Sequence, residues 1–346
     1  MRSITMPATL KDIAKETGLS TATISKYLNG AKLREKNRIA IEQAIRKLDY
    51  TVNEYARGFK LNRSHIIGVI IPDLNNLFIT NILVQMETLL REHDYSIMIC
   101  DCHTDAALER ELVHFLLGRM VDGIINMPVC TTGEHLKPAL SKKVPVLVLD
   151  RMISGLEGKI DNILIDNTCI ARKAVQSLID QGHRQIGLIS GPTDYSTSRE
   201  RLEGYRQALA SSKIPLNDSL IVCGDFTLEG GYEGICRLLK GNPNMTAVFP
   251  TNYDMTLGAF IALKEQNIRI PEDISFIGFD DMGLARVTHP PLTIVAQPLE
   301  QLGIYAAKRI LSRLENPEDV PISITLSASL KPGSSIGVPR HAEMSD

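Results

Sequence analysis

The first fifty residues carry apolar side chains at helical spacing in short stretches that polar breaks separate. Leu10, Ile13 and Ala14 recur on one face of the first stretch. Thr9 precedes this stretch and Asp12 follows three positions later, a pairing that is typical of a capped helix start. The pattern therefore predicts a short helix that begins after Thr9.

A second helix is predicted directly after a tight turn. Gly18 favours the left-handed conformation that ends the first helix, Leu19 fills the angle between the helices, and Ser20 predicts the cap of the next one. Ile24 and Leu28 form its inner face. Two helices joined in this way are typical of a helix-turn-helix unit, whose second helix enters the DNA major groove, although an ordinary helical hairpin has the same outline. The DNA contacts predicted from this unit are Thr9, Ser20, Thr21, Ala22, Thr23, Ser25, Lys26 and Asn29.

A third amphipathic stretch over residues 35–48 completes a small helical head. Ile41, Ala44 and Ile45 are spaced to cover the first two helices. Asn53 then caps a short stretch over residues 54–60, which is followed by a polar linker over residues 61–65. An isolated helix of this length is not stable in water, so residues 54–60 need a partner in order to fold.

Beyond residue 65 the chain alternates apolar runs with amphipathic stretches. Strands are expected at 66–71, 97–100, 123–127 and 146–149, and again at 186–190, 220–222, 247–250 and 275–279, with helices between them. The two series open on similar segments, SHIIGVIIPDLNN and GHRQIGLISGPTD. We therefore predict a small all-α head followed by an α/β body of two similar parallel-sheet lobes.

Charge separates the head from the body. Residues 1–65 contain 13 lysines and arginines against 6 acidic residues, whereas the whole chain has 38 against 40. Clustered cations suit phosphate contacts, and an acidic body disfavours nonspecific adhesion to nucleic acid. The cationic segment coincides with the helix-turn-helix pattern, which favours a DNA-binding head over a merely solvated basic surface.

Polar and aromatic residues follow the predicted strands at the points where two open parallel sheets expose a shared crevice. Such a crevice binds a small molecule through planar polar groups and an aromatic face. The alternative roles are helix caps for the aspartates, core packing for the phenylalanines and a surface ion pair for the arginine. The predicted ligand set is Asp73, Asn76, Phe78, Asp150, Arg151, Thr197, Arg201, Phe226, Asn252, Asp280 and Gln297, with Tyr195 as an additional contact.

The motifs LKDIAKETGLSTATISKYLNG, NEYARGF and IIGVIIPDLNNLF, in this order, resemble the lactose and galactose repressor (LacI) family of bacterial transcription regulators. The resemblance implies that residues 54–60 are a hinge helix that folds on DNA, with Arg57 and Phe59 at the minor groove. Phe59 replaces the usual leucine, Gly58 lowers helix propensity, and Lys26 stands where arginine is usual.

The resemblance also implies lobes of the periplasmic sugar-binding type that close on a small effector. Arg201, Asn252 and Asp280 match the polar effector clamp of the family, Phe226 matches its stacking aromatic, and Phe78 and Asp150 match the opposite lobe. The expected domains are a DNA-binding head at 1–52, a hinge and linker at 53–65, an N-terminal lobe at 66–164 plus 297–325, and a C-terminal lobe at 165–296 plus 326–340.

Other functional classes lack their signatures. Six cysteines form no metal-type pattern and are expected to be buried free thiols. The sequence has no Walker loop, dinucleotide fingerprint, zinc signature or Gly-x-Ser-x-Gly elbow, so no metal, cofactor or catalytic residue is predicted. Without a long apolar run or a signal-peptide pattern, a cytoplasmic protein with no membrane contact is expected. The expectation is a homodimeric repressor of carbohydrate-utilisation genes that binds a palindromic operator and responds allosterically to a sugar-like effector. One alternative is a catabolite-control regulator tuned by a phosphorylated carrier protein. The other is a sugar-binding or sugar-modifying protein, but a protein of either kind does not need the first 65 residues.

Overall fold

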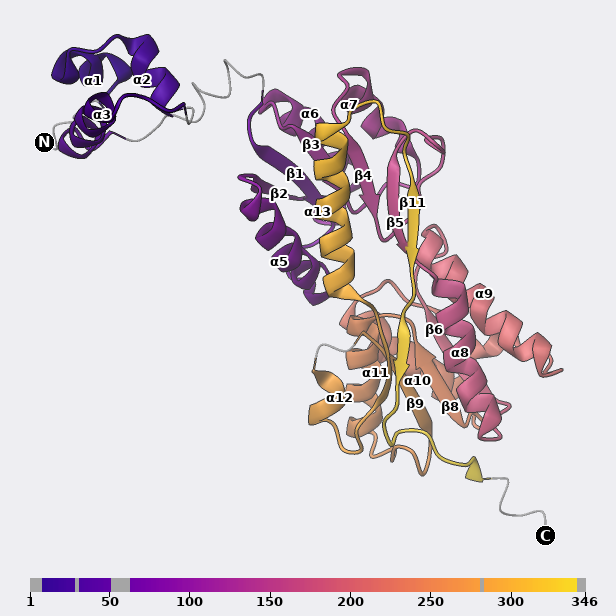
Figure 1. Ribbon diagram of the computed structural model, residues 1–346. Coiled ribbons are helices and arrows are strands. Elements are labelled where there is room, and N and C mark those ends of the chain that lie inside the picture. The colour runs from indigo at the N-terminus through magenta and orange to yellow at the C-terminus, as the bar shows by residue number, and fades with distance from the viewer. Residues whose placement is uncertain (1–7, 29–30, 51–62, 281–282, 341–346) are drawn as a thin grey trace, which may run out of the picture. The chain divides into compact units, whose positions relative to one another are not determined.

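A computed structural model describes residues 8–28, 31–50, 63–280 and 283–340 (Figure 1). The chain divides after Ser64 into two compact units, which we treat separately. Asn29, Arg57, Phe59 and the predicted hinge over residues 54–60 lie outside the described residues.

The first unit is the predicted three-helix head, α1 (Leu10–Thr17), α2 (Thr21–Leu28) and α3 (Glu35–Lys47). The Asp12 carboxylate accepts hydrogen bonds from both the backbone nitrogen and the hydroxyl of Thr9. Gly18 has φ +69°, the left-handed conformation that the turn requires. Ile13, Ile24 and Ile41, one from each helix, are fully buried and form the centre of the small core.

The second unit contains two six-stranded sheets. The first has the order β11-β5-β4-β3-β1-β2 and is parallel throughout. Its strands are β1 (Ile66–Ile71), β2 (Ser96–Asp101), β3 (Gly123–Asn126), β4 (Val146–Leu149), β5 (Asp161–Ile165) and β11 (Ser323–Leu326). We call this sheet and its helices the first lobe.

The second lobe is built on the sheet β12-β10-β9-β8-β6-β7, in which only the β10–β12 pairing is antiparallel. Its strands are β6 (Ile186–Ser190), β7 (Ile221–Cys223), β8 (Ala247–Pro250), β9 (Ser275–Phe279), β10 (Thr293–Ala296) and β12 (Ser329–Lys331). The central strands of both sheets are almost wholly apolar and buried on both faces, as parallel sheets covered by helices require.

Helices cover both faces of each sheet, so each lobe has two apolar cores (Figure 1). In the first lobe, α5 (Leu77–Glu92) and α13 (Leu299–Glu315) cover one face, and α6 (Ala106–Gly118) and α7 (Lys137–Ser141) cover the other. In the second lobe, α8 (Asn167–Asp180) and α9 (Ser196–Ser211) cover one face, and α10 (Leu228–Gly241) and α11 (Tyr253–Glu265) cover the other. The short elements η1 (Gly133–Leu136), η2 (Asp218–Leu220) and α12 (Leu284–Val287) lie in the connections.

The chain passes between the lobes more than once, which the strand pattern alone does not reveal. After β10 in the second sheet it forms α13 and β11 in the first lobe, and it then returns to the second sheet as β12. The sequence analysis listed eight of the twelve strands in these two sheets and omitted β5, β10, β11 and β12. Within the described residues no helix has the length and apolarity needed to cross a membrane.

The expectation of six buried thiols is correct only in part. All six cysteines are free, and Cys100 and Cys102 are buried. Cys223 is exposed because it ends β7, a short edge strand. The other three, Cys130, Cys169 and Cys236, are partly exposed.

Candidate functional site: a recognition helix and an interlobe cleft

Helix α2 presents small side chains to solvent at its start and a cationic side chain in its last turn. Thr21, Ala22 and Lys26 are exposed, while the hydroxyls of Ser20 and Thr23 bond each other at 2.9 Å across the helix start. The Ser20 hydroxyl also accepts from the Thr23 backbone nitrogen, which caps the helix as predicted. Small and polar exposed side chains of this kind are those that contact base edges in a major groove.

A polar network fixes α2 against α3. The Tyr27 hydroxyl donates to Glu42 at 2.8 Å, and Arg38 donates to the same carboxylate at 2.6 Å. This hydrogen bond raises the pKa of the Tyr27 hydroxyl and lowers the pKa of Glu42. The orientation of the exposed face of α2 is therefore set by contacts on its opposite side.

In the second unit, the carboxyl ends of the strands of both sheets border a cavity of about 460 Å³, lined by Asp73, Asn76, Phe78, Asp150, Arg151, Tyr195, Phe226 and Asp254 among others. A smaller space of about 70 Å³ adjoins it and adds Thr197, Arg201, Asn252, Asp280 and Gln297. All eleven predicted ligand residues therefore line one cleft between the lobes.

Arg201 lies at the base of the second-lobe wall and is only 4% exposed. Its Nε donates to Asn167 at 2.8 Å, its Nη1 donates to the Thr251 carbonyl at 2.5 Å, and the guanidinium lies 4.1 Å from the ring centre of Phe279. Burial lowers the pKa of Arg201, and the carboxylates of Asp150 and Asp280 oppose this effect. The guanidinium is therefore held by neutral hydrogen-bond partners. This arrangement suits the binding of an oxygen-rich ligand.

Asp280 directly follows β9 and is 4% exposed, with φ +65°. Its Oδ1 accepts from Gln297 Nε2 at 2.7 Å, while Gln297 Oε1 is buried and has no partner among the described residues. Burial raises the pKa of Asp280 to about 6, although Arg201 and Gln297 favour its ionised form. A hydroxyl that donates to this carboxylate would compensate for its desolvation.

Asn252 is a helix cap as well as a cleft residue. Its Oδ1 accepts from the Met255 backbone nitrogen at the start of α11, and its Nδ2 donates to the Phe226 carbonyl at 3.0 Å. Phe226 has φ +69°, which is unusual for an aromatic residue. The amide of Asn252 therefore helps to hold Phe226 in a strained conformation that places its ring on the cleft wall.

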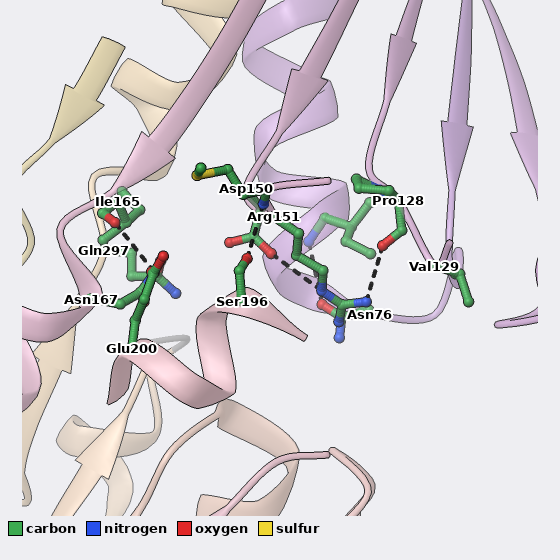
Figure 2. A network of polar contacts seen from close by, with 12 residues as sticks. Asn76, Pro128, Val129, Asp150, Arg151, Ile165, Asn167, Ser196, Glu200 and Gln297 are labelled. Carbon is green, nitrogen blue, oxygen red and sulfur yellow. Dashed lines mark hydrogen bonds and ion pairs between the residues drawn. The ribbon is translucent and has the colours of Figure 1, made fainter. Parts of the chain in front are cut away.

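Asp150 and Arg151, which follow β4, form part of the first-lobe wall (Figure 2). Burial raises the pKa of Asp150, and its Oδ1 has no partner among the described residues. Arg151 lies 3.8 Å from Asp150 Oδ2 and donates to the Pro128 carbonyl at 3.2 Å. Its guanidinium also lies 3.9 Å from the ring centre of Tyr195, across the cleft.

Two further contacts join the lobes. The Met152 backbone nitrogen donates to the Ser196 hydroxyl at 2.9 Å (Figure 2). Asn76 caps α5 through its Oδ1, and its Nδ2 is 3.5 Å from Asp254 on the opposite wall. Asn76 is thus chiefly a cap that also approaches the other lobe.

The sequence analysis gave Tyr195 a minor role and missed Asp254. Tyr195 stacks at 6.0 Å on Phe226 and is covered by Arg151. Asp254 follows Asn252 at the start of α11, so its position after β8 was the available signal. Burial and the neighbouring Asp73 raise the pKa of Asp254.

Phe78 is partly buried and packs against the first-lobe core while it also lines the cleft.

Comparison with known families accounts for both units. Residues 9–53 match the family model described as bacterial regulatory proteins, lacI family. Residues 64–330 match periplasmic binding proteins and sugar binding domain of LacI family. The chain belongs to the LacI family. Members of this family are DNA-binding transcriptional regulators and are not enzymes.

Individual relatives match along nearly the whole chain. Catabolite control protein A of Priestia megaterium is 34% identical, over 92% of this chain and 96% of that protein. The ribose operon repressor of Haemophilus influenzae is 34% identical, over 90% of this chain and 93% of that protein. A solved lac repressor dimer, bound to operator and the anti-inducer ONPF, matches with a TM-score of 0.85 and 26% identity, over 96% of this chain and all of that one. The predicted fold, a helical head followed by two parallel-sheet lobes, is thereby confirmed for this LacI-family chain.

Proposed function

We propose that this LacI-family chain represses carbohydrate-utilisation genes as a homodimer and that a neutral or weakly charged sugar in the interlobe cleft controls its binding to a palindromic operator. The protein then acts in the cytoplasm, where its operator is accessible. The cleft supplies what a pyranose or furanose needs, namely a fixed guanidinium at Arg201, acceptors at Asp150 and Asp280, and aromatic faces at Tyr195 and Phe226.

The observation that carries this proposal is the orientation of Arg201 by two hydrogen bonds and a ring contact within the cleft. A cation buried to this extent is costly unless it has a further partner, because burial weakens its hydration. A ligand oxygen at the cleft would supply that partner. The ribose operon repressor and the operator-bound lac repressor among the relatives support a sugar-controlled DNA-binding role.

The test measures operator binding and sugar binding on the same protein. Operators are first selected from random duplexes, and a panel of pentoses, hexoses and disaccharides is then screened by thermal shift. We expect a small subset of sugars to raise the melting temperature and to change operator affinity at least tenfold, which is a coupling free energy of about 1.4 kcal/mol. Failure of every sugar in both assays would contradict the proposal.

The catabolite-control relative supplies a second outcome of the same experiment. If no sugar acts but a phosphorylated carrier protein strengthens operator binding, the cleft is not the control site and regulation is by a protein partner. The Thr21→Ala variant tests the DNA-binding part of the proposal, because Thr21 is exposed at the start of α2. It should lower the affinity for the selected operators without changing sugar binding.

An apolar groove in the second lobe supports dimerisation. The groove, of about 970 Å³, is lined by Leu257, Phe260 and Ile261 of α11 and by Val287, which is 76% exposed. An aspartate at so exposed a position does not disturb the core, so Val287→Asp should leave the melting temperature of the monomer unchanged. Sedimentation equilibrium should show that it shifts the dimer towards monomer, with Val320→Asp, equally exposed and outside the groove, as the control.

A further inference from the structure

A cluster of metal-ligating side chains lies inside the first lobe, among residues that the cleft does not use. Glu109 of α6, Cys130 after β3, and His135 of η1 place one ligand atom each within 4.8 Å of one another. Glu109 is fully buried, His135 is 5% exposed, and Cys130 is partly exposed. The three residues come from separate elements, so the fold brings them together.

A fourth side chain points at the same position. Asn126, the last residue of β3, is fully buried, and its Nδ2 lies 2.8 Å from Glu109 Oε1 and 3.1 Å from His135 Nε2. Its carbonyl oxygen, Oδ1, is buried and has no partner among the described residues. A buried asparagine normally makes hydrogen bonds through both its amide nitrogen and its amide oxygen. The unpaired oxygen of Asn126, beside Glu109 and His135, is therefore an independent sign of a ligand.

Hydrogen bonds made by the other polar atoms of Glu109 and His135 orient both side chains. Glu109 Oε2 accepts from the backbone nitrogens of Val129 and Cys130 at 3.0 and 2.6 Å, which leaves Oε1 directed at the cluster. His135 Nδ1 lies 3.1 Å from the Thr132 carbonyl, so that its Nε2 faces Oε1 at 3.1 Å. Metal-binding histidines are commonly oriented in this way, by donation from the other ring nitrogen to a carbonyl.

We propose that Glu109 Oε1, Cys130 Sγ and His135 Nε2 bind a divalent transition metal, with Zn²⁺ as the ion of best fit, and that the Asn126 amide turns to present Oδ1 as the fourth ligand. The donor set mixes one thiolate, one imidazole and two oxygens, which suits a borderline-soft ion in tetrahedral geometry and disfavours Mg²⁺ or Ca²⁺. The 3.1 Å between Oε1 and Nε2 is close to the ligand spacing of about 3.3 Å that tetrahedral bonds of about 2 Å imply.

The site would brace the segment that carries one wall of the cleft. Cys130 and His135 lie on the connection that follows β3, and the Pro128 carbonyl of this connection accepts the hydrogen bond from Arg151. Fixing the connection by a metal would therefore hold Arg151 in place. The alternative is that Glu109 and His135 form only a buried ion pair that docks the connection, with Cys130 as a bystander.

The experiment titrates the full-length metal-free protein with Zn²⁺ and with Co²⁺. We expect one high-affinity ion per chain and, with Co²⁺, an intense near-ultraviolet band from sulfur-to-cobalt charge transfer together with the visible bands of tetrahedral coordination. Cys130→Ser, a change of one atom at a partly exposed position, should abolish the near-ultraviolet band and lower the affinity for Zn²⁺ at least tenfold. Cys236→Ser, another partly exposed cysteine outside the cluster, should change neither.

A second variant separates the metal site from the ion pair. Asn126→Asp keeps the shape of the side chain and supplies a carboxylate oxygen, so it should strengthen Zn²⁺ binding if position 126 is a ligand, with added metal raising its melting temperature more than that of the wild-type protein. Absence of stoichiometric Zn²⁺ binding in the wild-type protein, or equal binding by Cys130→Ser, would overturn the proposal in favour of the ion pair alone.

Discussion

The two walls of the interlobe cleft are built differently. On the second-lobe wall, Arg201 is fixed by two hydrogen bonds and an aromatic face, and Asn252 caps a helix while it holds the Phe226 carbonyl. On the first-lobe wall, Asp150 has an unsatisfied oxygen and Arg151 reaches across the cleft to the ring of Tyr195. One wall is organised by its own lobe, and the other is organised partly by contacts with the opposite lobe.

This difference assigns different tasks to the two walls. A preorganised wall binds a ligand with little loss of side-chain entropy, so it should determine affinity. A wall whose contacts span two lobes changes its partners when the lobes move, so it should determine how ligand binding alters the conformation. Variants on the two walls should therefore separate affinity from conformational response.

The largest effect is expected at Arg201. Arg201→Lys keeps the charge but loses the planar fork that bonds Asn167 and Thr251. Effector affinity should fall about 100-fold, equivalent to about 3 kcal/mol, as measured by isothermal titration calorimetry. Operator affinity without effector should stay within a factor of three, and a comparable loss of operator binding would show that Arg201 supports the fold rather than the ligand.

Asp280→Asn should give the next largest effect. It should raise the free energy of unfolding and weaken effector binding. The pKa of Asp280, about 6, exceeds the ordinary value of 3.8, so the folded state favours the neutral acid. The stability that this group contributes is therefore complete below about pH 4 and is lost as the pH rises through 6. At pH 8, Asp280→Asn should raise the free energy of unfolding of the ligand-free protein by an amount on the order of 2 kcal/mol.

The control for Asp280→Asn is the pH dependence of the same measurement. Denaturant unfolding at pH 4 should show little difference between the variant and the wild-type protein, because both carry a neutral side chain there. Effector binding at pH 8 should nevertheless weaken, since asparagine offers only one acceptor oxygen. If the variant gains no more stability over the wild-type protein at pH 8 than at pH 4, the desolvation of the Asp280 carboxylate is already compensated in the ligand-free state.

Arg151 should have a smaller effect on stability and a larger one on conformation. Arg151→Gln removes the guanidinium from Tyr195 and Phe226, which lie 3.9 and 5.6 Å from it. Loss of this contact should destabilise the arrangement of the lobes in this structure by about 1 kcal/mol. Small-angle X-ray scattering on the body, residues 63–346, should show a larger radius of gyration without effector, while Arg91→Gln, whose guanidinium bonds Glu87 on the surface of α5, should not change it.

The elements and the positions of the cleft residues could be predicted because they depend on local pattern and on strand direction. Ile66–Ile71 and Val146–Leu149 are continuous apolar runs, and residues that follow parallel strands must meet at one edge of the sheets. The partners of those residues could not be predicted. That Asn252 bonds the Phe226 carbonyl, or that Arg151 covers Tyr195, depends on side-chain directions across elements far apart in sequence.

The strand pattern did not reveal the crossings between the lobes, and only the resemblance implied them, through the divided lobe bounds at 297–325 and 326–340. The short strand β11 has only half-buried apolar positions, so its pattern resembles that of a loop. The grouping of Glu109 with Asn126, Cys130 and His135 was also not predicted, because Glu109 is far from the other three residues in sequence. Tertiary contacts supply in both cases the information that periodicity lacks.

The smallest expected effect concerns Asp254, which joins the two walls most weakly. Its carboxylate is 3.5 Å from Asn76 Nδ2, while burial and the neighbouring Asp73 raise its pKa. Asp254→Asn removes the cost of burying a charge and keeps an acceptor for Asn76, so the ligand-free protein should become more stable by less than about 1 kcal/mol at pH 8. Differential scanning calorimetry at pH 4 and pH 8 measures this gain, which should vanish at the lower pH. A loss of stability would mean that the contact between Asp254 and Asn76 holds the lobes more tightly than its length indicates, and the two walls would then be less independent than their hydrogen bonds imply.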